Sequence, residues 1–403
     1  MAEMKKSRAF MSLLLSILLL ISVVGCNRGE IEGTEQILNP DIGLRGGLLI
    51  AGKNAAAKEP EIKSTAYLAL DDVGKKLYDS AYTALAANEN TFKLTGIDLK
   101  PYGETYAYAL TLFINEHPEF FWLDGYVEVS TERMSSSNIG NMTVVLGTYD
   151  DWLNNDIVTA QNELDKAVSS IVSQTSTLED DYEKVKFVHD YIIEFNSYDY
   201  EAYELGEAID AQTDALVSSA YGALVSGKIM CAGYAKAFDL LMQELGIESF
   251  FVSGVADGGS HAWNLVKIGD GYYHIDLTWD DLDGSPTEVR YDYFCLTDEE
   301  IAKTHTADEG TLYPEANATE YNYFVKEEMF LDYYSFAAVN KLAKKYDGEG
   351  VFTFKCYDTK VLKDAVKELV ENNMIFKIEQ FENVNSFQYI ADETSNVLSF
   401  YFE

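Results

Sequence analysis

Three residue types that thiol catalysis requires occur in order within a short stretch of the chain. Cys231 opens an apolar stretch with helical spacing that continues to Leu245. His261 opens a predicted strand, and Asp276 ends the next one. A neutral imidazole can take the proton of a thiol, and a carboxylate on its other nitrogen holds the ring in the required tautomer and orientation. The order and setting of these residues therefore point to acyl transfer through a thioester.

Each of the three residues also has an ordinary structural interpretation. A lone cysteine on an apolar helix face is usually a core residue, and Asp276 could simply cap Thr278 or the following turn. The first turn of a helix, however, offers unpaired N–H groups and a dipole that favour a thiolate. Gly233, two residues after the cysteine, lets another segment approach that turn closely. The ordered trio is much less expected by chance than any one of its members.

The turn between the two predicted strands decides whether His261 and Asp276 can meet. A two-residue loop at Gly269-Asp270 places Asp276 opposite Trp263, on the same face as His261 and at a diagonal spacing that the side chains can bridge. A loop shifted by one residue moves Asp276 about 13 Å along the strand from His261. The proposed chemistry thus requires Gly269-Asp270, with glycine at the first central position of a type II′ turn.

Three motifs around these residues resemble those of the transglutaminase-like superfamily. They read Cys231-Ala-Gly-Tyr-Ala235, His261-Ala-Trp-Asn264 and Tyr273-His-Ile-Asp-Leu-Thr-Trp279, and the resemblance covers about residues 180–285. It implies an α+β fold with a papain-like core, in which a helix carrying the cysteine packs on an antiparallel sheet carrying the histidine and the aspartate. It also implies a catalytic triad of Cys231, His261 and Asp276.

The resemblance implies an enzyme that cleaves or transfers amide bonds, peptide or isopeptide, through a cysteine thioester. Animal cross-linking enzymes of this superfamily have tryptophan after the cysteine, whereas this chain has Ala232; hydrolysis is therefore favoured over amine transfer. The expected substrates are proteins, peptides or cell-wall peptides. The alternative is a non-catalytic protein that binds a peptide or a cell-wall glycopeptide in the same cleft, although such a protein has no need of all three residue types.

The hydrogen-bond donors for the oxyanion are only partly identified by the sequence. The backbone N–H of Cys231 is the expected first donor. Papain-like proteases place a glutamine six residues before the cysteine, and this chain has Val225 there. Candidates for the second donor are Tyr221, Ser226 and Lys228, which precede the cysteine.

The N-terminus has the pattern of a bacterial lipoprotein signal peptide. Lys5-Lys-Ser-Arg8 is basic, and an apolar stretch follows over residues 9–24. It ends in Val23-Val-Gly-Cys26, which resembles a lipobox. We therefore expect removal of residues 1–25, lipidation of Cys26, and an extracytoplasmic protein held to a membrane by its lipid anchor. An ordinary signal peptide is the alternative.

Composition restricts the partners and the cofactors. The formal net charge is −37, which excludes nucleic acid as a partner because phosphate binding needs basic surfaces. Beyond Cys26 the chain has Cys231, Cys295 and Cys356, and an odd number implies at least one free thiol. A disulfide between Cys295 and Cys356 is possible but has no spacing argument behind it. Histidine and cysteine spacings show no metal motif, so the sequence predicts no metal ligand and no cofactor.

The predicted organisation is a catalytic domain between two small α+β domains. Residues 26–63 are polar and glycine-rich and are interpreted as a tether. The N-terminal domain is expected over 64–150, the transglutaminase-like domain over 151–310 and the C-terminal domain over 311–403.

Three local patterns add expectations about secondary structure. Ser176-Thr-Leu-Glu179 has the pattern of a capping box ahead of a helix. Residues 208–219 are polar, small and non-periodic and are expected to form a loop or a plain connection. Ile375-Phe-Lys-Ile378 is expected to be a strand of the C-terminal domain.

Overall fold

The computed structural model describes residues 64–100, 104–134, 138–149, 157–281, 289–308, 313–346 and 350–402. The predicted signal peptide, Cys26 and the whole predicted tether lie outside these residues. Among the described residues, no helix combines the length and the apolar character needed to cross a membrane. The chain divides into two compact units, residues 1–264 with 306–314 and residues 265–305 with 315–403. The predicted domain boundaries stay a prediction.

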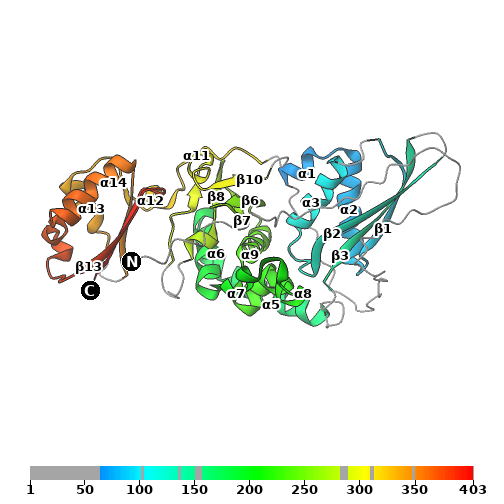
Figure 1. The fold of residues 1–403 in the computed structure, drawn as a ribbon, viewed down its shortest axis with the longest axis horizontal. Coiled ribbons are helices and arrows are strands. Elements are labelled where there is room, and N and C mark those ends of the chain that lie inside the picture. The colour runs from blue at the N-terminus through cyan, green and yellow to red at the C-terminus, as the bar shows by residue number, and fades with distance from the viewer. Residues whose placement is uncertain are drawn as a thin grey trace. The chain divides into compact units, whose positions relative to one another are not determined.

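A three-stranded sheet and two longer helices dominate the described residues 64–149 (Figure 1). Its elements are α1 (Thr65–Ala69), α2 (Asp72–Ala86), β1 (Thr91–Asp98), α3 (Glu104–Glu116), β2 (Leu123–Arg133) and β3 (Ile139–Thr148). The Asp71 carboxylate accepts the N–H groups of Val73 and Gly74 and so fixes the start of α2. The strands lie in the order β1-β3-β2, and both pairs are antiparallel.

Helices dominate the middle of the chain and surround the helix that carries Cys231 (Figure 1). They are α5 (Ile157–Gln174), α6 (Asp181–Phe195), α7 (Tyr200–Leu205), α8 (Ala211–Val217) and α9 (Cys231–Glu244), with a short parallel pair of β4 (Ser197–Tyr198) and β5 (Lys228–Ile229). Helix α9 packs against α5, α6 and strand β6. Tyr234, Phe238 and Leu241 are essentially buried, so α9 is a core helix along most of its length.

A five-stranded sheet follows α9 in the sequence. Its strands are β6 (Ser249–Ala256), β7 (Gly259–Ile268), β8 (Gly271–Ile275), β9 (Phe294–Leu296) and β10 (His305–Ala307). They are joined by hydrogen bonds in the order β10-β6-β7-β8-β9. Within this sheet, the strand that comes last in the sequence, β10, therefore pairs with the one that comes first, β6. A helix carrying the cysteine and a sheet carrying the histidine confirm the predicted α+β fold of this region.

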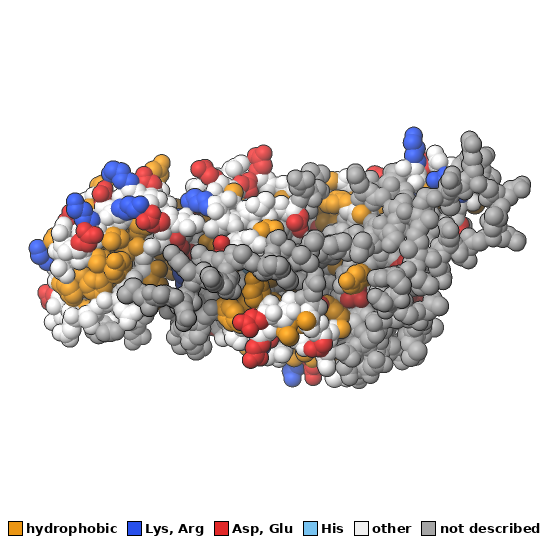
Figure 2. Space-filling model, in the orientation of Figure 1, with side chains coloured by type: hydrophobic (Ala, Val, Ile, Leu, Met, Phe, Trp, Pro, Cys, Tyr) orange, Lys and Arg blue, Asp and Glu red, His pale blue; other side chains and the backbone are white. Residues whose placement is uncertain are grey.

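The C-terminal region forms a separate sheet with its own core. Its elements are α12 (Tyr323–Lys326), β11 (Phe330–Leu331), α13 (Phe336–Ala343), β12 (Val351–Cys356), α14 (Thr359–Val366), β13 (Phe387–Asp392) and β14 (Val397–Phe402), with strand order β11-β12-β14-β13. Phe352, Phe381 and Phe400 lie in that core. Figure 2 shows acidic and basic side chains side by side over this region. The structure also holds an ion pair between Nζ of Lys363 and Oε2 of Glu393 at 2.9 Å.

Three local predictions were wrong. Helix α6 is capped by Asp180, whose carboxylate accepts the N–H of Glu183, and not by the predicted box that starts at Ser176. Residues 211–217 form helix α8 because the carboxylate of Asp210 caps it by accepting the N–H groups of its first turn. Residues 374–377 form a 3-10 helix and not a strand.

Candidate active site

Cys231 is the first residue of α9, and its thiol is free and partly exposed. Met230 precedes it in an extended conformation, so the backbone N–H of Cys231 has no partner within the helix. The cysteine packs on a small apolar cluster that contains Phe251 and Ala262. Because Ala262 directly follows His261, the packing brings the start of α9 next to the start of β7.

Gly233 holds this end of the helix against the preceding segment. A Cβ atom at this position would lie 2.7 Å from the carbonyl oxygen of Val217 and 2.9 Å from Cβ of Ile229, too close for any other residue. The same carbonyl accepts the N–H of Met230 at 2.8 Å. The predicted close approach at Gly233 is therefore confirmed, and it fixes the position from which Cys231 projects.

The other two described cysteines have a different environment. Cys295 and Cys356 are free, so the disulfide considered from the sequence is not formed. Both are buried, and burial raises the pKa of the Cys295 thiol well above its usual value and that of Cys356 to about 12. Among these three thiols, Cys231 is the one that solvent reaches.

The hairpin of β7 and β8 has the predicted turn. Strand β7 ends at Ile268, β8 begins at Gly271, and Gly269 takes a φ of +59°, as the first central position of a type II′ turn requires. Asp276 follows β8 and caps the short helix α10 (Leu277–Asp280): its Oδ1 accepts the N–H groups of Thr278 and Trp279 at 3.0 and 3.3 Å. Asp276 thus caps the following turn, as its ordinary structural interpretation predicted, and it uses one of its two oxygens to do so.

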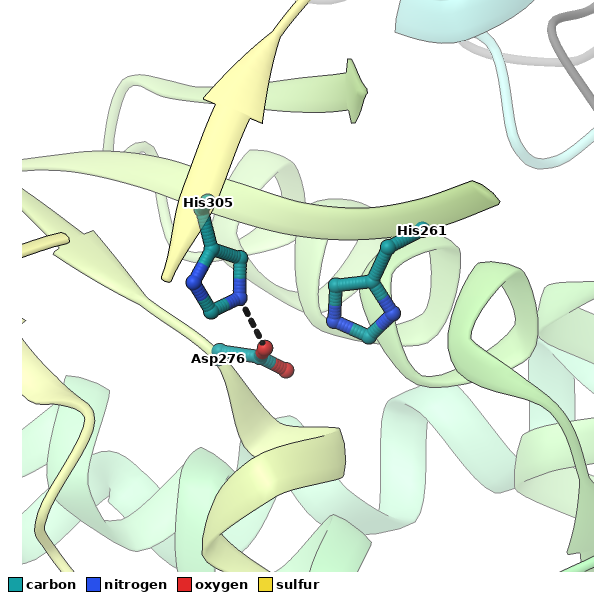
Figure 3. A group of neighbouring side chains, drawn as sticks. All are labelled: His261, Asp276 and His305. Atoms are coloured by element: carbon teal, nitrogen blue, oxygen red, sulfur yellow. Dashed lines mark hydrogen bonds and ion pairs between the residues drawn. The ribbon is translucent and has the colours of Figure 1, made fainter. Parts of the chain in front are cut away.

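The carboxylate of Asp276 lies close to two histidines (Figure 3). Each of His261, Asp276 and His305 offers one ligand-type atom, and the three atoms lie within 4.8 Å of one another. Nε2 of His305 donates a hydrogen bond to Oδ2 of Asp276 at 2.9 Å, and both side chains are fully buried. The structure therefore brings His261 and Asp276 together as expected, and it adds a second histidine. The assignment of a Cys231-His261-Asp276 triad stays a prediction.

His305 was not found from the sequence. It lies 29 residues after Asp276 on a three-residue strand, in Thr304-His-Thr306, which matches no motif. Its ring is held by neighbours: Oγ1 of Thr304 is 2.7 Å from its Nδ1, and the ring of Trp279 packs at a centroid distance of 4.6 Å. The sequence offered one signal for His305: histidine is rare in this chain, which contains five.

The side chains proposed as second oxyanion donors make other interactions. The hydroxyl of Tyr221 donates to Oε2 of Glu163 at 2.7 Å. Nζ of Lys228 lies 3.1 Å from Oδ1 of Asp199, and the hydrogen bond to this carboxylate is the main cause that raises the pKa of Lys228. Ser226 ends the π-helical turn before Gly227. Nothing in these contacts directs any of the three toward Cys231, so the second donor stays unassigned.

Helix α9 also carries a buried acid, eight residues after Cys231. Asp239 is fully buried and accepts a hydrogen bond from the hydroxyl of Ser249. Burial raises the pKa of Asp239 to about 7, and the charge of the nearby Glu116 adds to that shift. The hydroxyl of Tyr78 donates to Oε2 of Glu116 at 2.7 Å. The sequence pattern predicted a uniformly apolar helix here and did not reveal this acidic group.

Comparison with known proteins identifies the central region. Residues 169–277 match the family model of the transglutaminase-like superfamily. This range includes Cys231, His261 and Asp276 and ends before His305. No curated protein matches the chain.

Similar solved structures share little sequence with the chain. One is a transglutaminase, with 18% identity, a TM-score of 0.28 and 48% of each chain covered. Another is a protein from Cytophaga hutchinsonii proposed to be a cysteine protease, with 17% identity and a TM-score of 0.24; the match covers 38% of this chain and 62% of that one. A third, proposed to be a protease, comes from Parabacteroides distasonis, with 13% identity, a TM-score of 0.21, and 41% and 44% covered. The chain thus spans about half the length of the first of these structures.

Proposed function

Since residues 169–277 form a transglutaminase-like superfamily domain, we propose that this protein is a thiol enzyme that cleaves amide bonds. The observation that carries the proposal is the setting of Cys231: a free, partly exposed thiol at the first residue of a helix, packed beside strand β7, which carries His261. A helix N-terminus favours the thiolate, and an imidazole beside it can hold the thiol proton.

The reaction proceeds in two halves. Sγ of Cys231 attacks the carbonyl carbon of the amide while its proton passes to His261. The tetrahedral intermediate then collapses, the C–N bond breaks, and the amine leaves with the proton from the imidazole. Water attacks the resulting thioester and gives a proton to His261. The C–S bond then breaks, the acid leaves, and the sulfur of Cys231 takes the proton back from the imidazole. Asp276 orients the imidazole and balances its charge in both halves.

Hydrolysis is favoured over amine transfer because the tryptophan that follows the cysteine in animal cross-linking enzymes is replaced by Ala232. The proposed substrates are peptides, proteins or cell-wall peptides. The lipobox-like sequence ending in Cys26 supports an extracytoplasmic enzyme on a lipid anchor.

Selective alkylation tests the thiol. In the lipidated protein, whose Cys26 thiol is blocked by the anchor, iodoacetamide near pH 6 should label one cysteine stoichiometrically, at Cys231. Cys295 and Cys356 should react only after unfolding because both are buried. The Cys231→Ser protein is the matched control and should take up no label. An inert Cys231 would favour the alternative function, a protein that binds a peptide or a glycopeptide without cleaving it.

Substrate profiling tests the reaction. Libraries of peptide and cell-wall amides should yield an acid and an amine with the wild-type protein and neither product with Cys231→Ser. Adding a primary amine in excess separates the two outcomes of the thioester, since transfer would give a new amide. Binding without any product in these libraries would contradict the enzyme proposal.

Fractionation tests the anchor. Cys26→Ala should move the protein from the membrane fraction to the soluble or uncleaved pool. The Cys295→Ala variant, which changes a cysteine outside the signal region, should stay in the membrane fraction. Normal processing and an unchanged membrane fraction for Cys26→Ala would show that the lipid is not the anchor.

A further inference from the structure

The three side chains in Figure 3 form a ligand set as well as a catalytic group. Two imidazole nitrogens and a carboxylate oxygen lie within 4.8 Å of one another, contributed by β7, the residue after β8, and β10. Among the described residues this is the one group of three or more such side chains gathered so closely. Histidine nitrogen and carboxylate oxygen are preferred zinc ligands, and three protein ligands with an open fourth position are a common zinc arrangement.

The three ligand atoms lie within 4.8 Å of one another, and binding one ion requires them to close to about 3.3 Å, so the side chains must adjust, that of His261 most of all. Zinc bonds of about 2.0–2.1 Å in tetrahedral geometry separate two ligand atoms by about 3.3 Å. Nε2 of His305 and Oδ2 of Asp276 are now 2.9 Å apart across a shared proton. Replacing that proton by an ion requires the two atoms to separate by a few tenths of an ångström, which side-chain torsions can supply.

The surroundings of His305 and Asp276 orient both ligands. Oγ1 of Thr304 lies 2.7 Å from Nδ1 of His305. When an ion replaces the proton on Nε2, the ring keeps a proton on Nδ1, and the Thr304 hydroxyl can accept a hydrogen bond from that N–H. Oδ1 of Asp276 is held by the N–H groups of Thr278 and Trp279, so Oδ2 is the oxygen that remains for an ion.

We propose that His261, Asp276 and His305 bind a divalent transition-metal ion, with zinc as the best fit, and that this ion inhibits the thiol reaction. The inhibition rests on the proposed function, whereas the binding does not. An ion on His261 takes the nitrogen lone pair that would accept the thiol proton, and an ion on Asp276 takes the carboxylate that would orient the imidazole. Metal binding and thiol catalysis then exclude each other.

Zinc titration of the metal-stripped full-length protein in detergent tests the binding. We expect one zinc per chain by calorimetry, and visible d–d absorption typical of tetrahedral coordination when cobalt replaces zinc. His305→Gln should weaken zinc binding at least 100-fold. His274→Gln is the matched control, since Nε2 of His274 also lies 2.9 Å from a carboxylate, that of Asp298, and neither residue belongs to the three-residue group. It should bind zinc like the wild type.

The outcomes separate this proposal from the proposed function. Circular dichroism and the thermal midpoint establish that each variant is folded, and His305→Asn serves if His305→Gln is not. Cys231→Ser should retain zinc binding, because the thiol is not one of the three ligands; loss of binding in this variant, with retention in His305→Gln, would place the ion on the thiol and overturn the proposal. Failure of the wild type to bind zinc at micromolar concentration would also overturn it. Turnover without zinc binding leaves the enzyme proposal intact, and zinc binding without turnover leaves the metal site intact.

Discussion

Asp276 and Asp239 are both fully buried, yet the groups around them differ. Asp276 accepts two backbone N–H groups on one oxygen and the Nε2–H of His305 on the other. Asp239 accepts a hydroxyl of Ser249, and its carboxylate lies near that of Glu116. Donors favour the charged form of a buried acid, whereas burial and like charges favour the neutral form. Equal burial therefore gives one carboxylate suited to orienting a histidine and another that binds a proton near neutral pH.

The largest loss of turnover should follow from removing the nucleophile or its base. Cys231→Ala and His261→Ala should each lower turnover by about 10³-fold or more, and the double variant should lose little beyond that, because the pair acts as one unit. Steady-state kinetics on a confirmed substrate measures this. Asp239→Asn, on the same helix but away from the site, should keep turnover within about twofold. Wild-type turnover in Cys231→Ala would disprove the thiol mechanism.

A smaller effect is expected when the carboxylate is neutralised but not removed. Asp276→Asn should lower turnover by about 10- to 10³-fold and keep more activity than Cys231→Ala, since it disturbs the orientation and charge balance of the imidazole and leaves the nucleophile. The pH profile of turnover should shift as well. If Asp276→Asn kept full activity and an unchanged profile, only a Cys231–His261 dyad would remain.

His305 should matter less than Asp276 because it acts through that carboxylate. His305→Gln in metal-free buffer removes the imidazole donor to Oδ2 and should lower turnover by about tenfold, with a change in kcat and not in KM. His274→Gln again provides the control, since the carboxylate partner of His274 is Asp298. Equal losses in the two histidine variants would mean that both act only through stability.

The smallest effect, and one on stability alone, should come from Asp239. The native state binds a proton at Asp239 up to about pH 7, whereas the unfolded chain releases it near the ordinary value of 3.8. The free energy of unfolding should therefore fall as pH rises from about 4 to 7, by at most about 1.4 kcal/mol per pH unit from this group. Asp239→Asn should flatten that slope in urea unfolding curves, and Asp332→Asn, at an exposed position, should not. An unchanged slope would mean that Asp239 stays charged in the native state.

The elements that could be predicted from the sequence are those whose signal is local. Helix α9 and the β7–β8 hairpin carry clear periodicity and a Gly-Asp turn, and both formed as expected. Helix α8 was missed because its seven residues are too few to show an apolar period, although Asp210 offered a local capping signal. The 3-10 helix at 374–377 was missed because a short apolar run is compatible with several structures.

The candidate site shows the same division. Cys231, His261 and Asp276 stand in motifs and were named from the sequence alone. His305 was not, because its place beside Asp276 is set by the pairing of strands that are distant in sequence, and no local pattern records such pairing. The neighbours of Asp239 could not be predicted for the same reason, since Ser249 and Glu116 belong to other elements.

The sheet order has a consequence for when the site can assemble. Strand β10 is the last strand of this sheet in the sequence and pairs with β6, about fifty residues earlier, so closing the sheet joins distant parts of the chain at a cost in chain entropy. A chain emerging from the ribosome or crossing a membrane carries Cys231, His261 and Asp276 well before His305 appears. Until residue 305 has been delivered and β10 has paired, Oδ2 of Asp276 lacks its imidazole donor. The nascent protein therefore passes through a stage in which all three motifs are present and the histidine that completes their surroundings has yet to arrive.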